Sequence, residues 1–179
     1  MKNDIDRVLI TREEICEVVK RLGREISWEY SGKNPIMVSV LKGAFIFMAD
    51  LVREVDIECS VEFMAVSSYG KGTQSSGEVR IIKDLDTNIE GRHVIIVEDI
   101  LDSGVTLSNL LRLLEARNPA SLAVCALFDK PERRIANIKL DYKGMEVPNE
   151  FIVGYGLDFG EKYRNLPDIC VLKPEIYAR

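Results

Sequence analysis

The apolar residues of this chain alternate between helical and strand spacing from one end to the other. Thr11 and Glu14 have the spacing of a capping box, and apolar residues recur on one helical face after them, which predicts a first helix. Apolar runs bounded by turn-forming residues predict strands. Expected after the first helix are strands at 36–41, 57–67, 79–82, 94–97 and 122–128, and helices at 44–55 and 107–114.

This alternation predicts an α/β fold with a doubly wound, mostly parallel sheet, whose ligands bind at the carboxyl ends of the strands. A length of 179 residues suits one domain, and we expect residues 1–179 to form it without a linker or repeat. A small polar stretch at about 68–78 lacks apolar periodicity, which indicates a mobile loop. After Arg134 the pattern changes to short strands and turns.

Composition and charge exclude several classes of partner. The chain is 46% hydrophobic and 30% charged, with a net charge of -5, which is typical of a globular protein and unfavourable for binding nucleic acid or an anionic membrane. No apolar stretch approaches the roughly 20 residues of a membrane span, and no signal-peptide pattern is expected at the start. The scattered cysteines form no C-x-x-C pair, so the sequence predicts free thiols and a cytoplasmic location.

The segment from Val94 to Leu107 is the most informative in the chain. Its four β-branched residues predict a strand buried on both faces, and the carboxylates of Glu98 and Asp99 follow directly. A small-residue turn then opens a helix, where free N–H groups and the positive end of the dipole favour a phosphate. Carboxylates suit ribose hydroxyls or a magnesium ion. The segment therefore predicts a site for a phosphorylated ribose, and a simple side-chain cap by Asp102 or Ser103 is the alternative.

This segment resembles the phosphoribosyl pyrophosphate loop of the type I phosphoribosyltransferases, whereas no P-loop and no G-x-G-x-x-G pattern occurs. The resemblance implies that Asp102 is the general base of the reaction. Val105 stands where some members carry a lysine, which leaves backbone amides and hydroxyls to hold the 5′-phosphate. The implied ribose and phosphate contacts are Glu98, Asp99, Asp102, Ser103, Gly104, Val105 and Thr106.

Two shorter segments narrow the resemblance to the hypoxanthine-guanine phosphoribosyltransferases. Leu41-Lys42-Gly43 is similar to their pyrophosphate loop, in which the peptide bond before the lysine can be cis. Leu127 to Pro131 ends a strand with Lys130, which the resemblance assigns as donor to the 6-oxo group of a purine. A charged donor at that position favours hypoxanthine or guanine over adenine.

The stretch from Phe151 to Pro167 resembles the base- and pyrophosphate-binding segment of the same family. The resemblance implies that Phe151 stacks on the purine and that the backbone of Ile152 contacts the edge of the purine. It also implies that Asp158 binds magnesium and that Arg164 contacts pyrophosphate through its planar guanidinium.

Taken over nearly the whole chain, the resemblance implies a purine salvage transferase. The expected reaction converts hypoxanthine or guanine and phosphoribosyl pyrophosphate into IMP or GMP and pyrophosphate, with Mg²⁺ held by Glu98, Asp99 and Asp158. The resemblance also implies a lid that begins at Ser68 and Tyr69, a small hood built from the N-terminal segment and residues of about 135–170, and a homodimer or homotetramer.

Two other functions remain open from the sequence. A xanthine-preferring transferase would use the same residues, and neither Lys130 nor Phe151 argues strongly against it. A nucleotide-sensing regulator that binds nucleic acid could also use this fold, but such proteins tend to have a basic face, and this chain is acidic. Steady-state assays with different bases would separate these possibilities.

Overall fold

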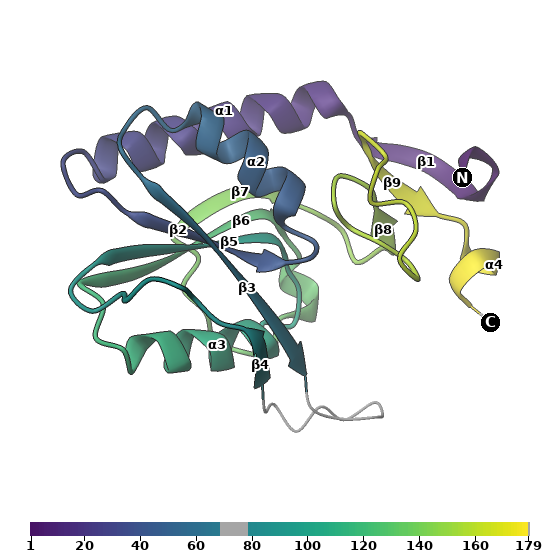
Figure 1. The fold of residues 1–179 in the computed structure, drawn as a ribbon. Coiled ribbons are helices and arrows are strands. Elements are labelled where there is room, and N and C mark those ends of the chain that lie inside the picture. Colours follow the sequence, from purple (N-terminus) through teal and green to yellow (C-terminus); the bar gives the residue numbers. More distant parts are fainter. Residues whose placement is uncertain (69–78, 179) are drawn as a thin grey trace.

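The computed structural model describes residues 1–68 and 79–178, which form a large mixed sheet covered on both faces and a small antiparallel sheet at one end (Figure 1). The predicted lid lies outside the described residues from Tyr69 onward. The helical elements are η1 (Lys2–Asp4), α1 (Arg12–Glu29), α2 (Phe45–Glu54), α3 (Val105–Glu115), η2 (Pro131–Arg133) and α4 (Pro174–Tyr177). The strands are β1 (Ile5–Ile10), β2 (Ile36–Leu41), β3 (Ser60–Ser68), β4 (Val79–Lys83), β5 (His93–Leu101), β6 (Ser121–Asp129), β7 (Tyr142–Glu146), β8 (Ile152–Val153) and β9 (Ile169–Leu172).

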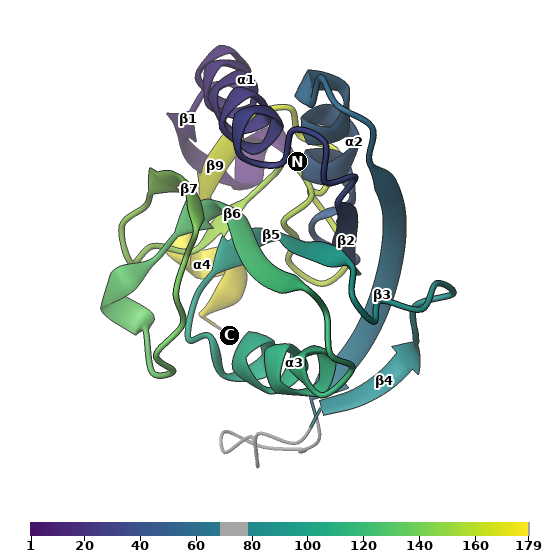
Figure 2. The ribbon, with the colours of Figure 1, turned by 90° about the vertical axis from the view of Figure 1, so that its left-hand side faces the viewer.

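The large sheet has the strand order β4-β3-β2-β5-β6-β7, and all of its neighbours are parallel except β4, which pairs antiparallel with β3 at the edge. Helices α1 and α2 cover one face and α3 covers the other, as Figure 2 shows along the strands. The predicted doubly wound, mostly parallel sheet is therefore confirmed.

The strand β5 lies at the centre of this sheet and is buried on both faces. Val94 and Ile96 belong to the apolar cluster under α3, whereas Ile95 and Val97 belong to the cluster under α1 and α2. Alternation of side chains along a strand explains this division. The capping box at the start of α1 also forms, because the Thr11 hydroxyl accepts from the Glu14 amide and the Glu14 carboxylate accepts from the Thr11 amide.

The small sheet has the order β1-β9-β8 and lies beyond the carboxyl ends of the large sheet (Figure 1). It contains N-terminal residues and residues after 150, as the predicted hood does. The predicted hood range of about 135–170 differs from the structure at β7, which joins the large sheet beside β6. The cause is a close backbone approach: a Cβ on Gly144 would lie 2.1 Å from the carbonyl oxygen of Leu127, so only glycine fits there.

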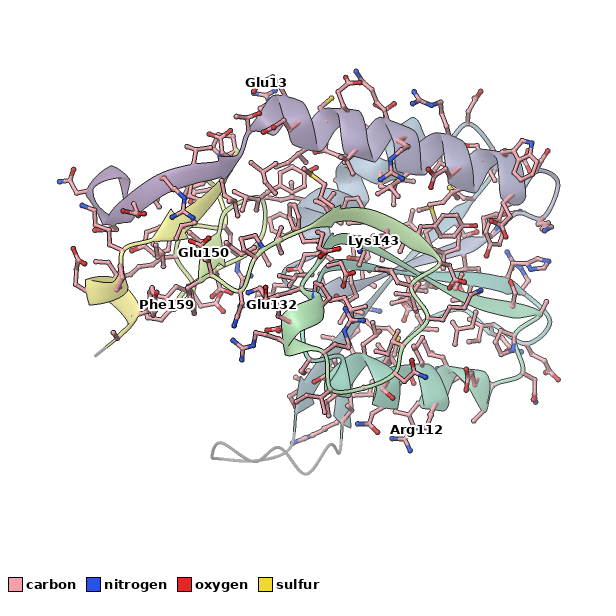
Figure 3. The ribbon with its side chains drawn as sticks, turned by 180° about the vertical axis from the view of Figure 1, so that it is seen from behind. Glu13, Arg112, Glu132, Lys143, Glu150 and Phe159 are labelled. Carbon is pink, nitrogen blue, oxygen red and sulfur yellow. The ribbon has the colours of Figure 1, made fainter. Side chains whose placement is uncertain are left out.

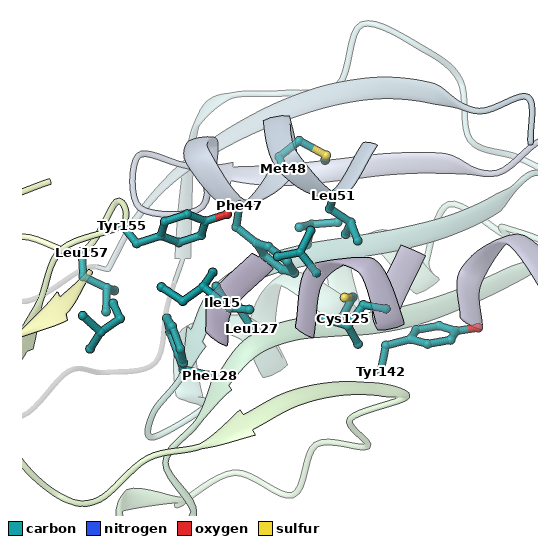
Figure 4. Close-up of a cluster of buried hydrophobic side chains, with 14 of the residues drawn as sticks. Ile15, Phe47, Met48, Leu51, Cys125, Leu127, Phe128, Tyr142, Tyr155 and Leu157 are labelled. Carbon is teal, nitrogen blue, oxygen red and sulfur yellow. The ribbon is translucent and has the colours of Figure 1, made fainter. Parts of the chain in front are cut away.

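The apolar core under α1 and α2 depends on large side chains from three elements, which Figure 4 shows in close-up. Phe47 of α2 has no exposed surface and packs in the same cluster as Ile15 of α1 and Phe128 of β6. Phe45 begins the same helix but faces outward, with 43% of its surface exposed. The two phenylalanines therefore separate the effect of burial from the effect of side-chain type.

We expect Phe47→Ala to lower the free energy of unfolding by about 3–5 kcal/mol, because truncation removes buried apolar surface and leaves a cavity. Urea denaturation followed by circular dichroism measures this change. Phe45→Ala is the matched control and should cost much less, since its ring already contacts solvent. Equal losses in the two variants would show that Phe47 is not part of a rigid core.

Candidate active site

A pocket of about 710 Å³ opens between the carboxyl ends of the large sheet and the small sheet. Figure 3 shows this region from behind: Glu132 lies on the side of the large sheet, and Glu150 and Phe159 lie on the side of the small sheet. The predicted site residues that line the pocket are Lys42, Gly43, Asp99, Asp102, Lys130, Phe151, Ile152, Asp158 and Arg164. The predicted ribose and phosphate contacts outside this lining are Glu98, Ser103, Gly104, Val105 and Thr106.

The acid pair divides between the two faces of β5, because consecutive residues of a strand point to opposite sides. Asp99 faces the pocket and lies against Gly43, where an added Cβ would come within 1.8 Å of the Asp99 Oδ2. The Asp99 Oδ1 accepts a hydrogen bond of 2.7 Å from the Ile100 amide. Glycine at position 43 is therefore needed for the carboxylate to approach the backbone after β2.

Burial raises the pKa of both acids of the pair. The pKa of Glu98 lies well above its usual value because of burial and then of the Asp99 charge. The pKa of Asp99 is also raised by burial, although the hydrogen bond from Ile100 and the positive charge of Arg164 oppose the shift. Both side chains are thus held where a neighbouring cation would be strongly favoured.

The carboxylates of the pocket fit a magnesium ion that takes some of its ligands from the protein and the others from a bound substrate and water. Within residues 1–68 and 79–178 no group of three or more histidine, cysteine or acidic side chains could hold a metal alone. Asp158 is engaged by Arg164 at 2.9 Å and by the Glu161 amide at 2.8 Å. Magnesium commonly binds one or two carboxylates and completes its shell with phosphate oxygens and water. Asp99 and Asp158 line the pocket and can supply such carboxylates.

The turn after β5 places Asp102 at the pocket and α3 behind it. Gly104 caps α3 with a left-handed φ of 77°, and a Cβ there would lie 2.8 Å from the Ile138 Cδ1. The Ser103 hydroxyl accepts from the Val105 amide at 3.4 Å, so the turn folds back on the helix start. The Asp102 Oδ1 lies 3.2 Å from the Arg133 Nε. The turn therefore joins a carboxylate and a helix N-terminus, as the sequence predicted.

Lys130 follows β6 and is 6% exposed, and burial lowers the pKa of its amine. Its Nζ donates a hydrogen bond of 2.9 Å to the carbonyl oxygen of Glu150 in the hood. The Glu150 carboxylate is in turn held by Arg7 of β1, with contacts of 2.6 and 2.5 Å. A buried ammonium group that points into a pocket is suited to a carbonyl oxygen of a ligand.

The ring of Phe151 has aromatic neighbours on the hood side of the pocket. Tyr177 of α4 stacks on it with ring centroids 4.8 Å apart, and Phe159 contacts it edge to face at 5.4 Å. These contacts fix the orientation of Phe151 while 36% of its surface stays exposed. An exposed, well-supported aromatic face is suited to stacking with a planar base.

The residues predicted to bind pyrophosphate lie close to each other. The Leu41–Lys42 peptide bond is cis, and the Lys42 Nζ pairs with Glu161 at 3.0 Å. Arg164 donates to the Gly156 carbonyl at 2.8 Å. Gly156 in turn approaches the loop after β2 so closely that an added Cβ would lie 2.1 Å from the Gly43 carbonyl oxygen.

The sequence did not identify several other residues of this region, among them Arg7, Arg133, Arg134 and Tyr177. The adjacent arginines follow Lys130 and Pro131, so their position beside a predicted site residue was a usable signal. Arg7 and Tyr177 lie near the two ends of the chain, where no local pattern relates them to the pocket. The described helices are too short or too polar to cross a membrane.

Comparison with known proteins agrees with this geometry. The phosphoribosyl transferase domain family matches residues 9–160. The hypoxanthine-guanine phosphoribosyltransferase of Bacillus subtilis is 55% identical, over 99% of this chain and 98% of that protein. The bifunctional protein TilS/HprT of Listeria monocytogenes is 56% identical over 99% of this chain, which spans only 28% of the length of that relative.

Solved structures give the same result. The hypoxanthine phosphoribosyltransferase of Staphylococcus aureus has a TM-score of 0.97 and 49% sequence identity, and the match covers 100% of this chain and 97% of that one. A hypoxanthine-guanine phosphoribosyltransferase of Bacillus anthracis has a TM-score of 0.91 and 44% identity, over 94% of this chain and 99% of that one. With the domain, the sequence identity and the fold all in agreement, this chain belongs to the hypoxanthine-guanine phosphoribosyltransferase family.

Proposed function

We propose that this protein transfers a phosphoribosyl group from phosphoribosyl pyrophosphate to hypoxanthine or guanine, forming IMP or GMP and pyrophosphate. The observation that carries the proposal is the meeting of Asp102, Lys130 and Phe151 in one pocket with Lys42, Asp99 and Arg164. The first group suits a purine with a 6-oxo group, and the second suits a pyrophosphate and a sugar. The cytoplasmic location and the dimeric or tetrameric assembly stay predictions.

The purine is held by residues from both sheets. Phe151 stacks on the base and the backbone of Ile152 contacts its edge, while Lys130 donates to the 6-oxo oxygen. In the structure the Lys130 amine already donates to the Glu150 carbonyl, which leaves further protons for an oxo group. The 6-amino group of adenine would place a hydrogen-bond donor against the Lys130 ammonium, which is also a donor.

The phosphoribosyl pyrophosphate is held on the other side of the base. Glu98 and Asp99 bind the ribose hydroxyls, and the start of α3 at Ser103 to Thr106 binds the 5′-phosphate with its free amides. Lys42, Gly43 and Arg164 bind the pyrophosphate. Asp99 and Asp158 hold the magnesium ion, which when bound supplies positive charge to the leaving pyrophosphate.

The chemical step replaces one bond at C1 of the ribose by another. The bond between C1 and the pyrophosphate oxygen breaks while N9 of the purine forms a bond to C1, through a state with oxocarbenium character. The Asp102 carboxylate accepts the proton from N7 of the base. Arg164 and the backbone at Lys42 and Gly43 stabilise the charge of the pyrophosphate that leaves.

Asp102→Asn tests the general base. The amide keeps the size of the side chain but cannot accept the N7 proton, so turnover should fall by about 10²–10⁴-fold. Binding of phosphoribosyl pyrophosphate, measured by calorimetry, should stay close to wild type because its phosphate contacts are backbone amides of the same turn. Asp86→Asn, at an exposed aspartate outside the pocket, is the control. Near-normal turnover of Asp102→Asn would exclude Asp102 as the base.

Lys130→Ala tests recognition of the 6-oxo group. Removing a buried donor should reduce kcat/KM for hypoxanthine and guanine far more than kcat/KM for the weak substrate adenine. An unmatched hydrogen-bonding group in a binding site can change specificity by about 10⁴–10⁵-fold. Lys130→Gln should recover part of the loss, since an amide also donates. Lys139→Gln, at an exposed lysine, is the control. An equal loss on all bases would mean that Lys130 supports the fold and not the choice of base.

The third test concerns the metal. Excess chelator should abolish transfer, and Asp99→Asn and Asp158→Ala should each raise the Mg²⁺ concentration that gives half-maximal activity, because each removes a carboxylate from the pocket. Glu132→Gln, at an exposed acid on the large-sheet side of the region, is the control. Full activity in excess chelator would contradict the proposed role of the carboxylates.

A further inference from the structure

Two arginine side chains of the segment after β6 contact the turn that carries Asp102: Arg133 pairs with the Asp102 carboxylate, and Arg134 binds the backbone of the turn. The Arg134 Nε donates to the carbonyl oxygen of Asp102 at 3.0 Å, and its terminal nitrogen donates to the carbonyl of Leu101 at 3.3 Å. The same terminal nitrogen pairs with the carboxylate of Asp129. One guanidinium therefore bridges the end of β5 and the end of β6.

Main-chain hydrogen bonds continue this connection on both sides of the arginine. The Lys130 amide donates to the Leu101 carbonyl at 3.0 Å. The amides of Ile135 and Ala136 both donate to the Ser103 carbonyl, at 2.9 and 3.0 Å. The segment after β6 is thus hydrogen-bonded through its backbone to the end of β5 and to the turn, and Arg134 adds side-chain hydrogen bonds to the backbone carbonyls of the same region.

The partner carboxylate of Arg134 is fixed in the same way. Asp129 is 7% exposed and also accepts from Lys143 of β7 at 2.9 Å. Because the side chain of Arg134 is only 21% exposed, water cannot easily replace these contacts. A planar guanidinium donates to several acceptors in a fixed geometry, which a lysine cannot reproduce.

The shape of the purine explains why the distance between Asp102 and Lys130 has to be fixed. The O6 and N7 atoms of a 6-oxopurine are neighbours on one edge of the base. Lys130 donates to O6 and Asp102 accepts the proton of N7, so the two side chains must stand side by side. They come from the ends of two different strands, and the contacts of Arg134 join those two ends.

We infer that Arg134 is a positioning residue for the phosphoribosyl transfer: it fixes the Asp102 turn against the end of β6, so that the general base meets N7 while Lys130 holds O6. This inference rests on the proposed function. Arg134 does not touch the reacting atoms and acts through the backbone of Asp102. Misplacement of a catalytic group by about 1 Å can cost about 10²-fold in rate.

The experiment compares wild type, Arg134→Gln, Arg134→Lys and the control Arg24→Gln, an exposed arginine of α1. Single-turnover rates report the chemical step separately from product release. We expect Arg134→Gln to slow guanine transfer by about 10²-fold and Arg134→Lys to slow it less, because lysine keeps the charge beside Asp129 but loses the fixed fork. Binding of phosphoribosyl pyrophosphate should change little. If Arg134→Gln does not fold, as judged by circular dichroism, Arg134→Lys carries the same comparison.

A second base shows whether the loss arises at the proton transfer. A guanine analogue with nitrogen in place of C8 has a more acidic ring proton and needs a general base less. The variants should therefore lose much less activity on this analogue than on guanine. A merely structural role would reduce both rates equally, and an equal loss would overturn the inference.

A double variant completes the test. In the Asp102→Asn background, Arg134→Gln should cause little further loss of rate. The effects of two mutations on the rate are not additive when both residues act through the same catalytic group. Fully multiplicative losses would overturn the inference, and so would a wild-type rate for Arg134→Gln. Absence of transfer to any oxopurine by wild type and by Arg24→Gln would instead contradict the proposed function, so the two failures are distinguishable.

Discussion

The parallel pairing of β2, β5 and β6 is the constraint on which the site depends. Because these strands run in the same direction, the loops after them emerge at one edge of the sheet and bring together Lys42, Asp102 and Lys130, which are far apart in the sequence. The strands can lie at the centre only because both of their faces are apolar. Polar chemistry is therefore confined to the strand ends, and the small sheet completes the pocket from the other side.

This arrangement gathers charged groups at the strand ends, and several of them are paired within the protein: Asp102 with Arg133, Asp158 with Arg164 and Lys42 with Glu161. Burial raises the pKa of Glu98 and Asp99 and lowers the pKa of Lys130. The backbone at Gly43 lies so close to the Asp99 carboxylate that no side chain fits between them. In the proposed function, the magnesium ion places a cation beside Asp99, and the carbonyl oxygen of the base gives Lys130 a further acceptor. The pKa shifts of these side chains are thus consistent with the proposed substrates, a phosphorylated sugar with magnesium and a base with a carbonyl oxygen.

The sequence predicted the parts of the fold that depend on local patterns. The capping box of α1, the buried strand β5 and the turn before α3 follow from residue order alone. It did not predict β7, whose polar residues form a strand because Gly144 permits close approach to β6 and because Arg21 donates to the carbonyls of Lys143 and Gly144. Likewise, Tyr177 supports Phe151 across a long sequence separation, and such contacts leave no periodic signal.

The two sheets supply different groups to the proposed reaction. The large sheet supplies the groups that act on C1 and N7, and its geometry is fixed by parallel pairing and by the contacts around Arg134. The small sheet supplies the aromatic ring and the backbone proposed to contact the base, and Lys130 connects the two sheets through its hydrogen bond to the Glu150 carbonyl. Since Arg7 of β1 holds the Glu150 side chain, the start of the chain helps to place a donor that lies more than a hundred residues away. On this proposal, choice of base depends on contacts between the sheets, whereas proton transfer depends on contacts within the large one.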